Sequence, residues 1–226
     1  MKYIYCLVSN LQPFHTLPLG LGGMRVYEVS FRYISALVSD LNSYRLKGNM
    51  EEALAHQRVV ARALLLSQSV VPCRFGMLFE TEEKVLSLLK GHYPTLRRHL
   101  TKLMGKVEVG IKAIFHARAV PGEGLMDGER YLLMKRGLME EADQLLRELN
   151  KATSPFWMEV KAERRYKDKG IFLNLCYLVE RGKLPSFEDS YRRFLRRRPD
   201  LTLVYTGPWP PYSFADIDLR KGQGDG

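Results

Sequence analysis

The order of the elements predicted for the second half of the chain constrains the fold more than any other feature of the sequence. Hydrophobic periodicity predicts a strand over 107–115, a long helix over 129–151, strands over 156–165 and 171–180, a helix that Ser186 caps and Pro199 ends, and a closing strand over 201–206. This is the order of a ferredoxin-like sandwich (a split βαβ arrangement), in which an antiparallel sheet carries both helices on one face. The sequence therefore predicts a ferredoxin-like C-terminal domain.

The first half of the chain also mixes strands and helices. Apolar and β-branched runs predict strands over 3–8, 25–29 and 31–38. Asn49 and Glu52 have the spacing of a capping box, which predicts that a helix begins here and extends over 51–67. Apolar residues at helical spacing are expected to form the apolar face of this helix: Met50, Ala53, Leu54, Ala61, Leu64 and Leu65.

Two further segments bear on the domain organisation. Residues 70–79 (VVPCRFGMLF) read as a strand, in which Pro72 lacks an N–H and must therefore lie at a sheet edge or a bulge. Residues 119–128 combine one proline with three glycines and are the best linker candidate. We therefore predict an α+β fold with two domains, a mixed α+β domain over 1–118 and the ferredoxin-like domain over 119–226, whose Pro/aromatic closing segment precedes a frayed tail at 220–226.

The chain is basic, with 35 lysines and arginines against 25 acidic residues in 226. Such a charge attracts nucleic acid, anionic lipid or an acidic protein without choosing among them. The densest basic cluster lies on the last predicted helix and comprises Arg192, Arg193, Arg196, Arg197 and Arg198. It falls in the nearly neutral half of the chain, and no strand carries an RNP-like aromatic motif for stacking bases. A solvated helix face or a contact with an acidic protein is favoured, and a nucleic-acid-binding adaptor is the alternative.

No motif for catalysis, cofactor binding or metal binding stands out. The five histidines show no metal-ligand spacing with cysteine or carboxylate residues, and residues 19–23 (LGLGG) match neither a dinucleotide fingerprint nor a P-loop. His56 could act as a base, but a structural helical histidine is favoured. Cys6, Cys73 and Cys176 lie in apolar runs and are expected to be reduced and buried, as in the cytosol. We predict no catalytic, cofactor or metal residue and no enzyme; an unrecognised enzymatic site between the domains is the weaker alternative.

No export signal is visible, and the longest apolar runs are far shorter than the ~20 residues of a membrane-spanning helix. We therefore expect a cytoplasmic protein that does not enter a bilayer. Residues 206–214 (TGPWPPYSF) are the most unusual stretch, since three prolines enforce an extended backbone that displays aromatic rings. This stretch is either a recognition strip or a segment whose Trp209, Tyr212 and Phe214 fold back over the domain seam, and the second interpretation is favoured.

Several motifs, in the same order along the chain, resemble the gas vesicle accessory proteins of the F/L family (GvpF/GvpL). They are an opening YxYxxV-like strand at 3–8, an AxVSD-like strand end at 36–40, a helical histidine at 56, a VxPxRFGxxF-like stretch at 70–79, a GxVExxxK-like strand at 105–112, an LNxxYLV-like strand at 173–179 and a GPWPPYSF-like close at 207–214. Departures are Cys73 and Cys176, where the family more often has small or apolar residues, and the basic tail after Phe214. The resemblance does not distinguish the F type from the L type.

The resemblance implies a non-enzymatic accessory or minor structural protein of gas vesicles, with the same two-domain architecture. It implies that the protein contacts the very hydrophobic shell protein during nucleation and assembly, together with other accessory proteins. A sheet edge at Pro72 could bind such a partner by strand addition. The residues we expect in partner binding are Pro72, Arg74, Phe75, Trp209 and Tyr212.

Overall fold

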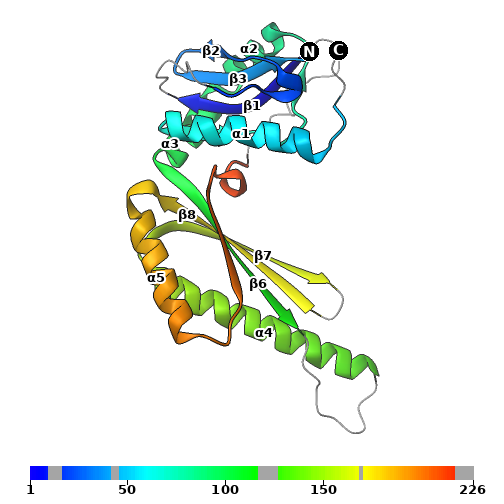
Figure 1. Ribbon diagram of the computed structural model, residues 1–226, viewed down its shortest axis with the longest axis vertical. Helices are drawn as coiled ribbons and strands as arrows, with labels where there is room; N and C mark the ends of the chain where they lie inside the picture. The colour runs from blue at the N-terminus through cyan, green and yellow to red at the C-terminus, as the bar shows by residue number, and fades with distance from the viewer. Residues whose placement is uncertain (10–16, 42–45, 117–126, 168–169, 217–226) are drawn as a thin grey trace. The chain divides into compact units, whose positions relative to one another are not determined.

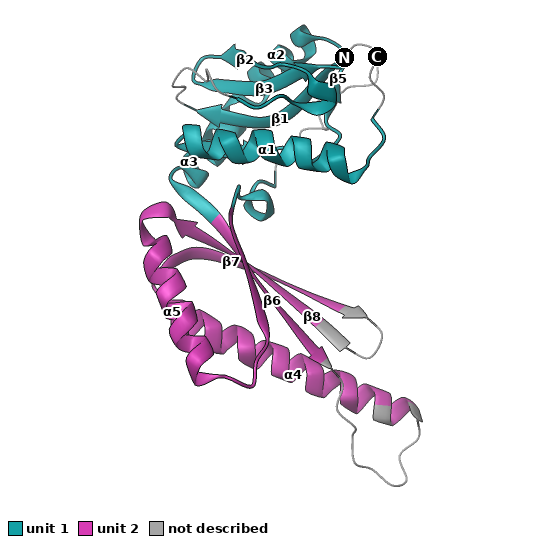
Figure 2. Cartoon of the chain, viewed as in Figure 1, with its two compact units in different colours: residues 1–107, 209–226 teal, residues 108–208 magenta. Residues whose placement is uncertain are grey.

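The computed structural model describes residues 1–9, 17–41, 46–116, 127–167 and 170–216. The chain forms two compact units (Figure 2). Unit 1 comprises residues 1–107 and 209–226, and unit 2 comprises residues 108–208. Each unit is built on its own sheet, and Figure 1 shows the course of the chain through both.

This division differs from the one that the sequence indicated, which placed a boundary after residue 118 and the closing segment in the second domain. The first unit ends at Val107, the second residue of the strand Lys106–His116, because this strand belongs to the sheet of unit 2. The segment after Pro208 returns to unit 1, where the Tyr212 hydroxyl donates a hydrogen bond to Oε1 of Gln57 at 3.2 Å. The predicted linker at 119–128 and the tail at 220–226 lie outside the described residues, except that 127 and 128 begin a helix.

Unit 1 contains an antiparallel sheet with the order β2–β3–β1–β4, and β5 also pairs with β1. Its strands are β1 (Lys2–Ser9), β2 (Val26–Phe31), β3 (Ile34–Asp40), β4 (Ser69–Pro72) and β5 (Leu78–Phe79). Its helices are α1 (Met50–Leu66), α2 (Glu82–Gly91) and α3 (Tyr93–Leu103). Every residue of β1 after Lys2 is buried, although successive side chains point to opposite faces. Both faces of this central strand are therefore covered.

The stretch predicted as one strand over 70–79 is two strands. Strand β4 ends at Pro72, which pairs with Cys6 of β1 at the edge of the sheet, as its missing N–H requires. The chain then turns, with Gly76 at a φ of 89°, before β5 pairs further along β1. The apolar composition of the stretch hid this turn, in which Arg74 and Phe75 are exposed.

Helix α1 begins as predicted but faces the core differently. Asn49 Oδ1 accepts a hydrogen bond from the Glu52 amide at 3.0 Å, and the Glu52 carboxylate accepts one from the Gly48 amide at 2.7 Å. The residues of α1 that are buried are Glu52, Ala55, His56, Val59, Val60, Ala63 and Leu64. Of the predicted apolar face only Leu64 is buried, while Met50, Leu54 and Leu65 are exposed. The prediction was wrong because α1 has apolar residues on two opposite sides, and the buried side also carries Glu52 and His56.

Unit 2 has the predicted ferredoxin-like order. Its elements are β6 (Lys106–His116), α4 (Asp127–Thr153), β7 (Trp157–Lys167), β8 (Gly170–Glu180), α5 (Leu184–Arg197) and β9 (Leu203–Trp209). The sheet order β7–β8–β6–β9 places the first and third strands of the motif side by side at its centre. Tyr177 of β8 reaches both helices, since its hydroxyl donates to Asn150 Oδ1 at 2.9 Å and its ring lies 5.2 Å from that of Phe187. Both helices thus cover one face of the sheet.

The start of α5 corrects one detail. Ser186 was expected to cap this helix, but the helix begins at Leu184, and Pro185 occupies its first turn. Proline is favoured there because the first helical amides have no intrahelical acceptor and its fixed φ suits the helix. Ser186 therefore lies within the helix.

Candidate functional site

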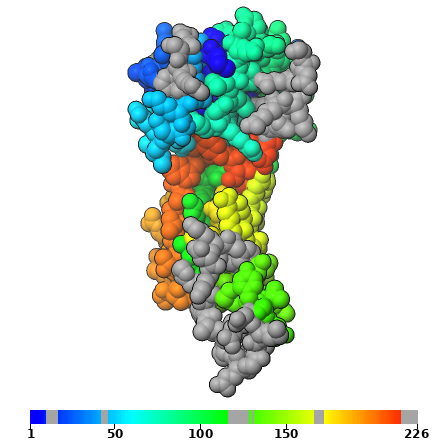
Figure 3. All heavy atoms as spheres, turned by 90° about the vertical axis from the view of Figure 1, so that its right-hand side faces the viewer, coloured from blue at the N-terminus to red at the C-terminus, as the bar shows by residue number. Residues whose placement is uncertain are grey.

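A cluster of aromatic rings surrounds one buried histidine in unit 1. We call Tyr3, Tyr5, His56, Phe75 and Tyr212 the aromatic cluster. The centroid of the His56 ring lies 5.6 Å from those of Tyr3 and Tyr5, 6.0 Å from Phe75 and 6.5 Å from Tyr212. The cluster joins β1, α1, the turn after β4 and the closing segment. Figure 3 shows the closing segment (red) beside α1 (cyan) at the surface.

Hydrogen bonds fix the histidine and, through it, the turn after β4. The Tyr3 hydroxyl lies 2.7 Å from His56 Nδ1 and accepts a hydrogen bond from the Gly76 amide at 3.2 Å. A hydroxyl has one proton, so Tyr3 can donate it to Nδ1 while accepting from Gly76. Burial lowers the pKa of His56 to about 4, so the ring is neutral at neutral pH, as this arrangement needs. His56 thus supports the turn and is not placed as a general base.

The second tyrosine of β1 anchors a different loop. The Tyr5 hydroxyl accepts a hydrogen bond from the Leu21 amide at 2.8 Å and bonds Ser39 Oγ at 2.8 Å. A Cβ at Gly20 would lie 2.0 Å from this hydroxyl, which explains why glycine is needed where the backbone passes the ring. The LGLGG stretch is accordingly a structural turn, with residues 21–23 in a short 3₁₀ helix.

The expected partner-binding residues occupy different positions. Pro72 is buried in β4, whereas Arg74 is exposed and Phe75 is 39% exposed beside His56. Tyr212 is half-buried against the same histidine, and Trp209 is exposed at the end of β9. The structure thus brings Phe75 and Tyr212 to one ring. Sequence reasoning missed Tyr3 and Tyr5, although their spacing places both on the same face of β1.

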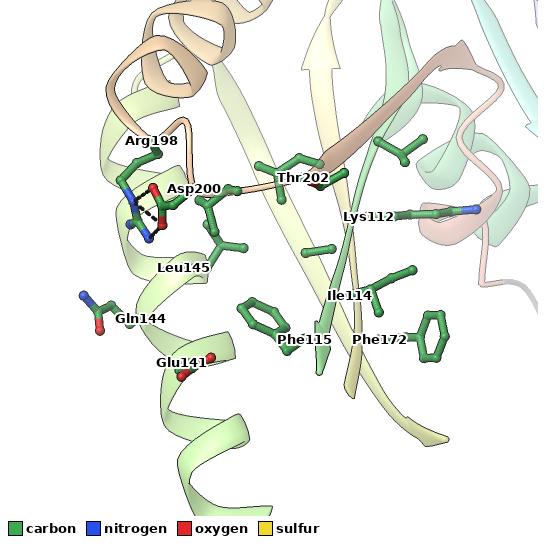
Figure 4. Close-up of a pocket in the computed structure, with 14 residues that line it drawn as sticks. Lys112, Ile114, Phe115, Glu141, Gln144, Leu145, Phe172, Arg198, Asp200 and Thr202 are labelled. Carbon is green, nitrogen blue, oxygen red and sulfur yellow. Dashed lines mark hydrogen bonds and ion pairs between the residues drawn. The ribbon is translucent and has the colours of Figure 1, made fainter. Parts of the chain in front are cut away.

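Unit 2 has a groove of about 990 Å³ between α4, β6 and the chain that leads into β9 (Figure 4). Phe115 and Leu145 line its helix side, while Ile114 and Phe172 point away from α4. The guanidinium of Arg198 at its rim is paired with Asp200 at 2.8 Å and also with Glu148. The groove is lined largely by apolar side chains.

Cys73 and the arginines of α5 differ in their exposure. Burial raises the pKa of the Cys73 thiol to about 12, which keeps it protonated and unreactive. On α5, Arg192, Arg193, Arg196 and Arg197 are exposed, and Arg193 pairs with Asp189 at 3.4 Å. Within the described ranges, no three potential metal-ligating side chains gather. Nor does any helix in the described part of the chain combine the length and apolarity needed to cross a bilayer.

Comparison with known proteins identifies the family. A family model described as "Gas vesicle synthesis protein GvpL/GvpF" matches residues 1–216. The chain belongs to this family. It is 28% identical over 208 residues to gas vesicle protein F1 of Halobacterium salinarum, covering 91% of this chain and 88% of that protein. It is also 28% identical to gas vesicle protein L of a Streptomyces species, over 189 residues that cover 74% of this chain and 70% of that one.

Solved structures confirm the α+β fold. The crystal structure of GvpF from Anabaena has a TM-score of 0.83 at 21% identity and covers 96% of each chain. The crystal structure of GvpF from Microcystis aeruginosa has a TM-score of 0.81 at 20% identity and covers 96% of this chain and 99% of that one. The match of the family model confirms the predicted membership of the gas vesicle F/L family, and an accessory role in gas vesicles follows from it.

Proposed function

We propose that the protein is a non-enzymatic accessory or minor structural protein that binds the hydrophobic gas vesicle shell protein and supports vesicle nucleation and assembly. The observation that carries this proposal is the match of the family model to residues 1–216. The neutral, buried His56 and the protonated Cys73 are consistent with a protein that transforms no substrate. On this proposal the protein works in the cytoplasm at the growing vesicle, with the shell protein and other accessory proteins as partners.

The turn after β4 is the surface we assign to the shell protein. An unassembled subunit with exposed apolar surface aggregates, and a partner that covers part of that surface delays this. Phe75 offers an aromatic ring, and Arg74 beside it can pair with a carboxylate of the subunit. The hydrogen bonds from Gly76 to Tyr3 and from Tyr3 to His56 hold the turn in place before binding, which lowers the entropy cost of association.

Co-expression with the shell protein tests this assignment. The wild-type chain should raise the amount of soluble shell protein and co-purify with it, while a Phe75→Ala, Arg74→Ala double variant should lose most of both effects. Tyr33→Ala is a matched control, because Tyr33 is an exposed aromatic residue at another turn of unit 1. Equal co-purification by the double variant would exclude this surface. Failure of the wild-type chain to bind at all would exclude direct shell binding.

The exposed arginines of α5 support a second candidate, the basic nucleic-acid-binding adaptor. Binding through phosphates would weaken steeply with salt. An Arg192→Ala, Arg193→Ala, Arg196→Ala variant should then bind RNA and DNA much more weakly than the wild-type chain. Flat binding curves for both proteins would eliminate this candidate.

A further inference from the structure

Helix α1 exposes a second apolar side. We call Met50, Leu54, Ala61 and Leu65 the outer stripe. With 100° per residue, these four positions fall within about 60° around the helix axis, roughly opposite the buried side. Met50 is 74% exposed, Leu54 52% and Leu65 73%. Three large apolar side chains aligned on one helix and left in solvent indicate an interaction surface rather than scattered surface residues.

The spacing of the outer stripe reads the same in both directions. Met50 and Leu65 lie at its ends, Leu54 and Ala61 lie four residues in from each end, and the midpoint falls between Gln57 and Arg58. A surface that is symmetric about its own midpoint is complementary to itself when a second copy is turned end to end, as in a two-fold interface. We propose that two copies of this chain pair through antiparallel α1 helices along the outer stripe. This proposal does not depend on shell binding.

In this arrangement the facing side chains are complementary in size and, at both ends of the pair, in charge. Met50 meets Leu65 of the second copy, and Leu54 meets Ala61, whose small side chain leaves room for the leucine. Glu51 comes near Arg62 of the second copy, so opposite charges face each other at both ends of the pair. Arg58 lies near the two-fold axis and faces its own counterpart, which is the one unfavourable pairing.

The pair is weak by this reasoning. A helix of 17 residues is about 25 Å long, and three large side chains from each copy bury less than the ~1,200 Å² of stable complexes. We therefore expect a dimer with a dissociation constant on the order of 10⁻⁵ M. Such a dimer forms where the protein is concentrated and separates on dilution.

Sedimentation velocity of the full chain tests the association. Between about 5 and 500 µM, a range that brackets the expected constant, the wild-type chain should shift from monomer to dimer. Leu54→Glu and Leu65→Glu should each remain monomeric, while Leu19→Glu, at an equally exposed leucine of unit 1, should dimerise like the wild-type chain. Thermal unfolding checks that each variant is folded. A wild-type chain that is monomeric throughout, or a dimer that both glutamate variants preserve, would overturn the proposal.

Cysteine cross-linking tests the antiparallel register. Arg58→Cys should cross-link to its counterpart under mild oxidation, because position 58 lies near the axis. Met50→Cys alone should not, since the two copies of position 50 lie about 22 Å apart, but Met50→Cys combined with Leu65→Cys should. The wild-type chain, whose Cys6, Cys73 and Cys176 are buried, gives the background. Efficient cross-linking of Met50→Cys alone would show a parallel pair and refute the register.

A substitution at Arg58 distinguishes dimerisation through the outer stripe from binding of an acidic protein to it. Replacing Arg58 by glutamine removes the repulsion at the axis and should tighten the dimer about twofold, since a like-charge contact at a surface costs a few tenths of a kcal/mol. An acidic protein bound to the same stripe would instead bind the glutamine variant more weakly. Weaker dimerisation of Arg58→Gln would therefore contradict the proposed geometry.

Discussion

Strand β1 of unit 1 and strand β8 of unit 2 both lie inside a sheet, yet their surroundings differ. Residues 3–9 of β1 are buried without interruption, so the sheet of unit 1 is covered on both faces. In β8, Leu173, Leu175 and Tyr177 are buried on the helix side, while Phe172 is exposed and Asn174 half-buried on the other. The central strand of unit 1 therefore offers no exposed face, whereas unit 2 retains an open stretch of sheet beside a groove.

The largest expected effect is the loss of unfolding free energy when a side chain of each sheet is shortened. Leu7→Ala removes a fully buried side chain from β1 and should lower the free energy of unfolding of unit 1 by about 3 kcal/mol. Val204→Ala, at a 53% exposed position of β9, should lower that of unit 2 by less than about 0.5 kcal/mol. Amide hydrogen exchange of β1 and of β8 across a urea series reports each unit separately. Equal losses of unfolding free energy in the two variants would contradict the difference in burial between the two sheets.

The next effect is a pH dependence of stability, caused by the buried His56 of unit 1. In the folded state the pKa of His56 is lowered from 6.5 to about 4 by desolvation. Its contribution to stability is therefore complete above pH 6.5 and is lost as the pH falls toward 4, by up to about 3 kcal/mol. His56→Phe, which keeps an aromatic ring but cannot take up a proton, should lose less stability over the same range. Identical pH profiles of unfolding would show that His56 is not the group responsible.

A smaller effect compares two glycines. A Cβ at Gly20 would lie 2.0 Å from the hydroxyl of buried Tyr5, while one at Gly110 would lie 2.5 Å from Thr206 Oγ1, which can rotate away. We expect Gly20→Ala to cost about 2 kcal/mol and Gly110→Ala about 1 kcal/mol. Adding Tyr5→Phe should recover part of the Gly20→Ala loss, and adding Thr206→Ala part of the other. Thermal unfolding of the two double-mutant cycles measures this, and a larger cost at Gly110 would reverse the comparison.

Local patterns in the sequence predicted much of this structure. The element order of unit 2 and the Asn49–Glu52 cap of α1 depend on neighbours within a few residues. The edge position of Pro72 follows from its missing N–H. The buried side of α1 did not follow from the pattern, because both sides are apolar and the buried side also carries Glu52 and His56. Hydrogen bonds reach the Glu52 carboxylate and Nδ1 of His56. Periodicity detects an apolar side but does not say which of two faces the core.

Less of the candidate site could be predicted from the sequence. Phe75 and Tyr212 were both proposed for partner binding, but their approach to one histidine depends on a return of the chain that no local pattern encodes. The burial of Pro72 likewise comes from pairing with a strand at the start of the chain. Contacts between residues far apart in sequence depend on the whole fold, and single-sequence patterns do not carry them.

The return of residues 209–216 to unit 1 has a consequence for biosynthesis. Residues 108–208 are translated after the first 107 residues of unit 1 and before the segment that contributes Tyr212 and Phe214 to it. On the ribosome, unit 2 can therefore finish folding while unit 1 still lacks its last piece. The surface around His56 is completed only when the closing segment emerges, which delays any binding there until residues 209–216 have been made.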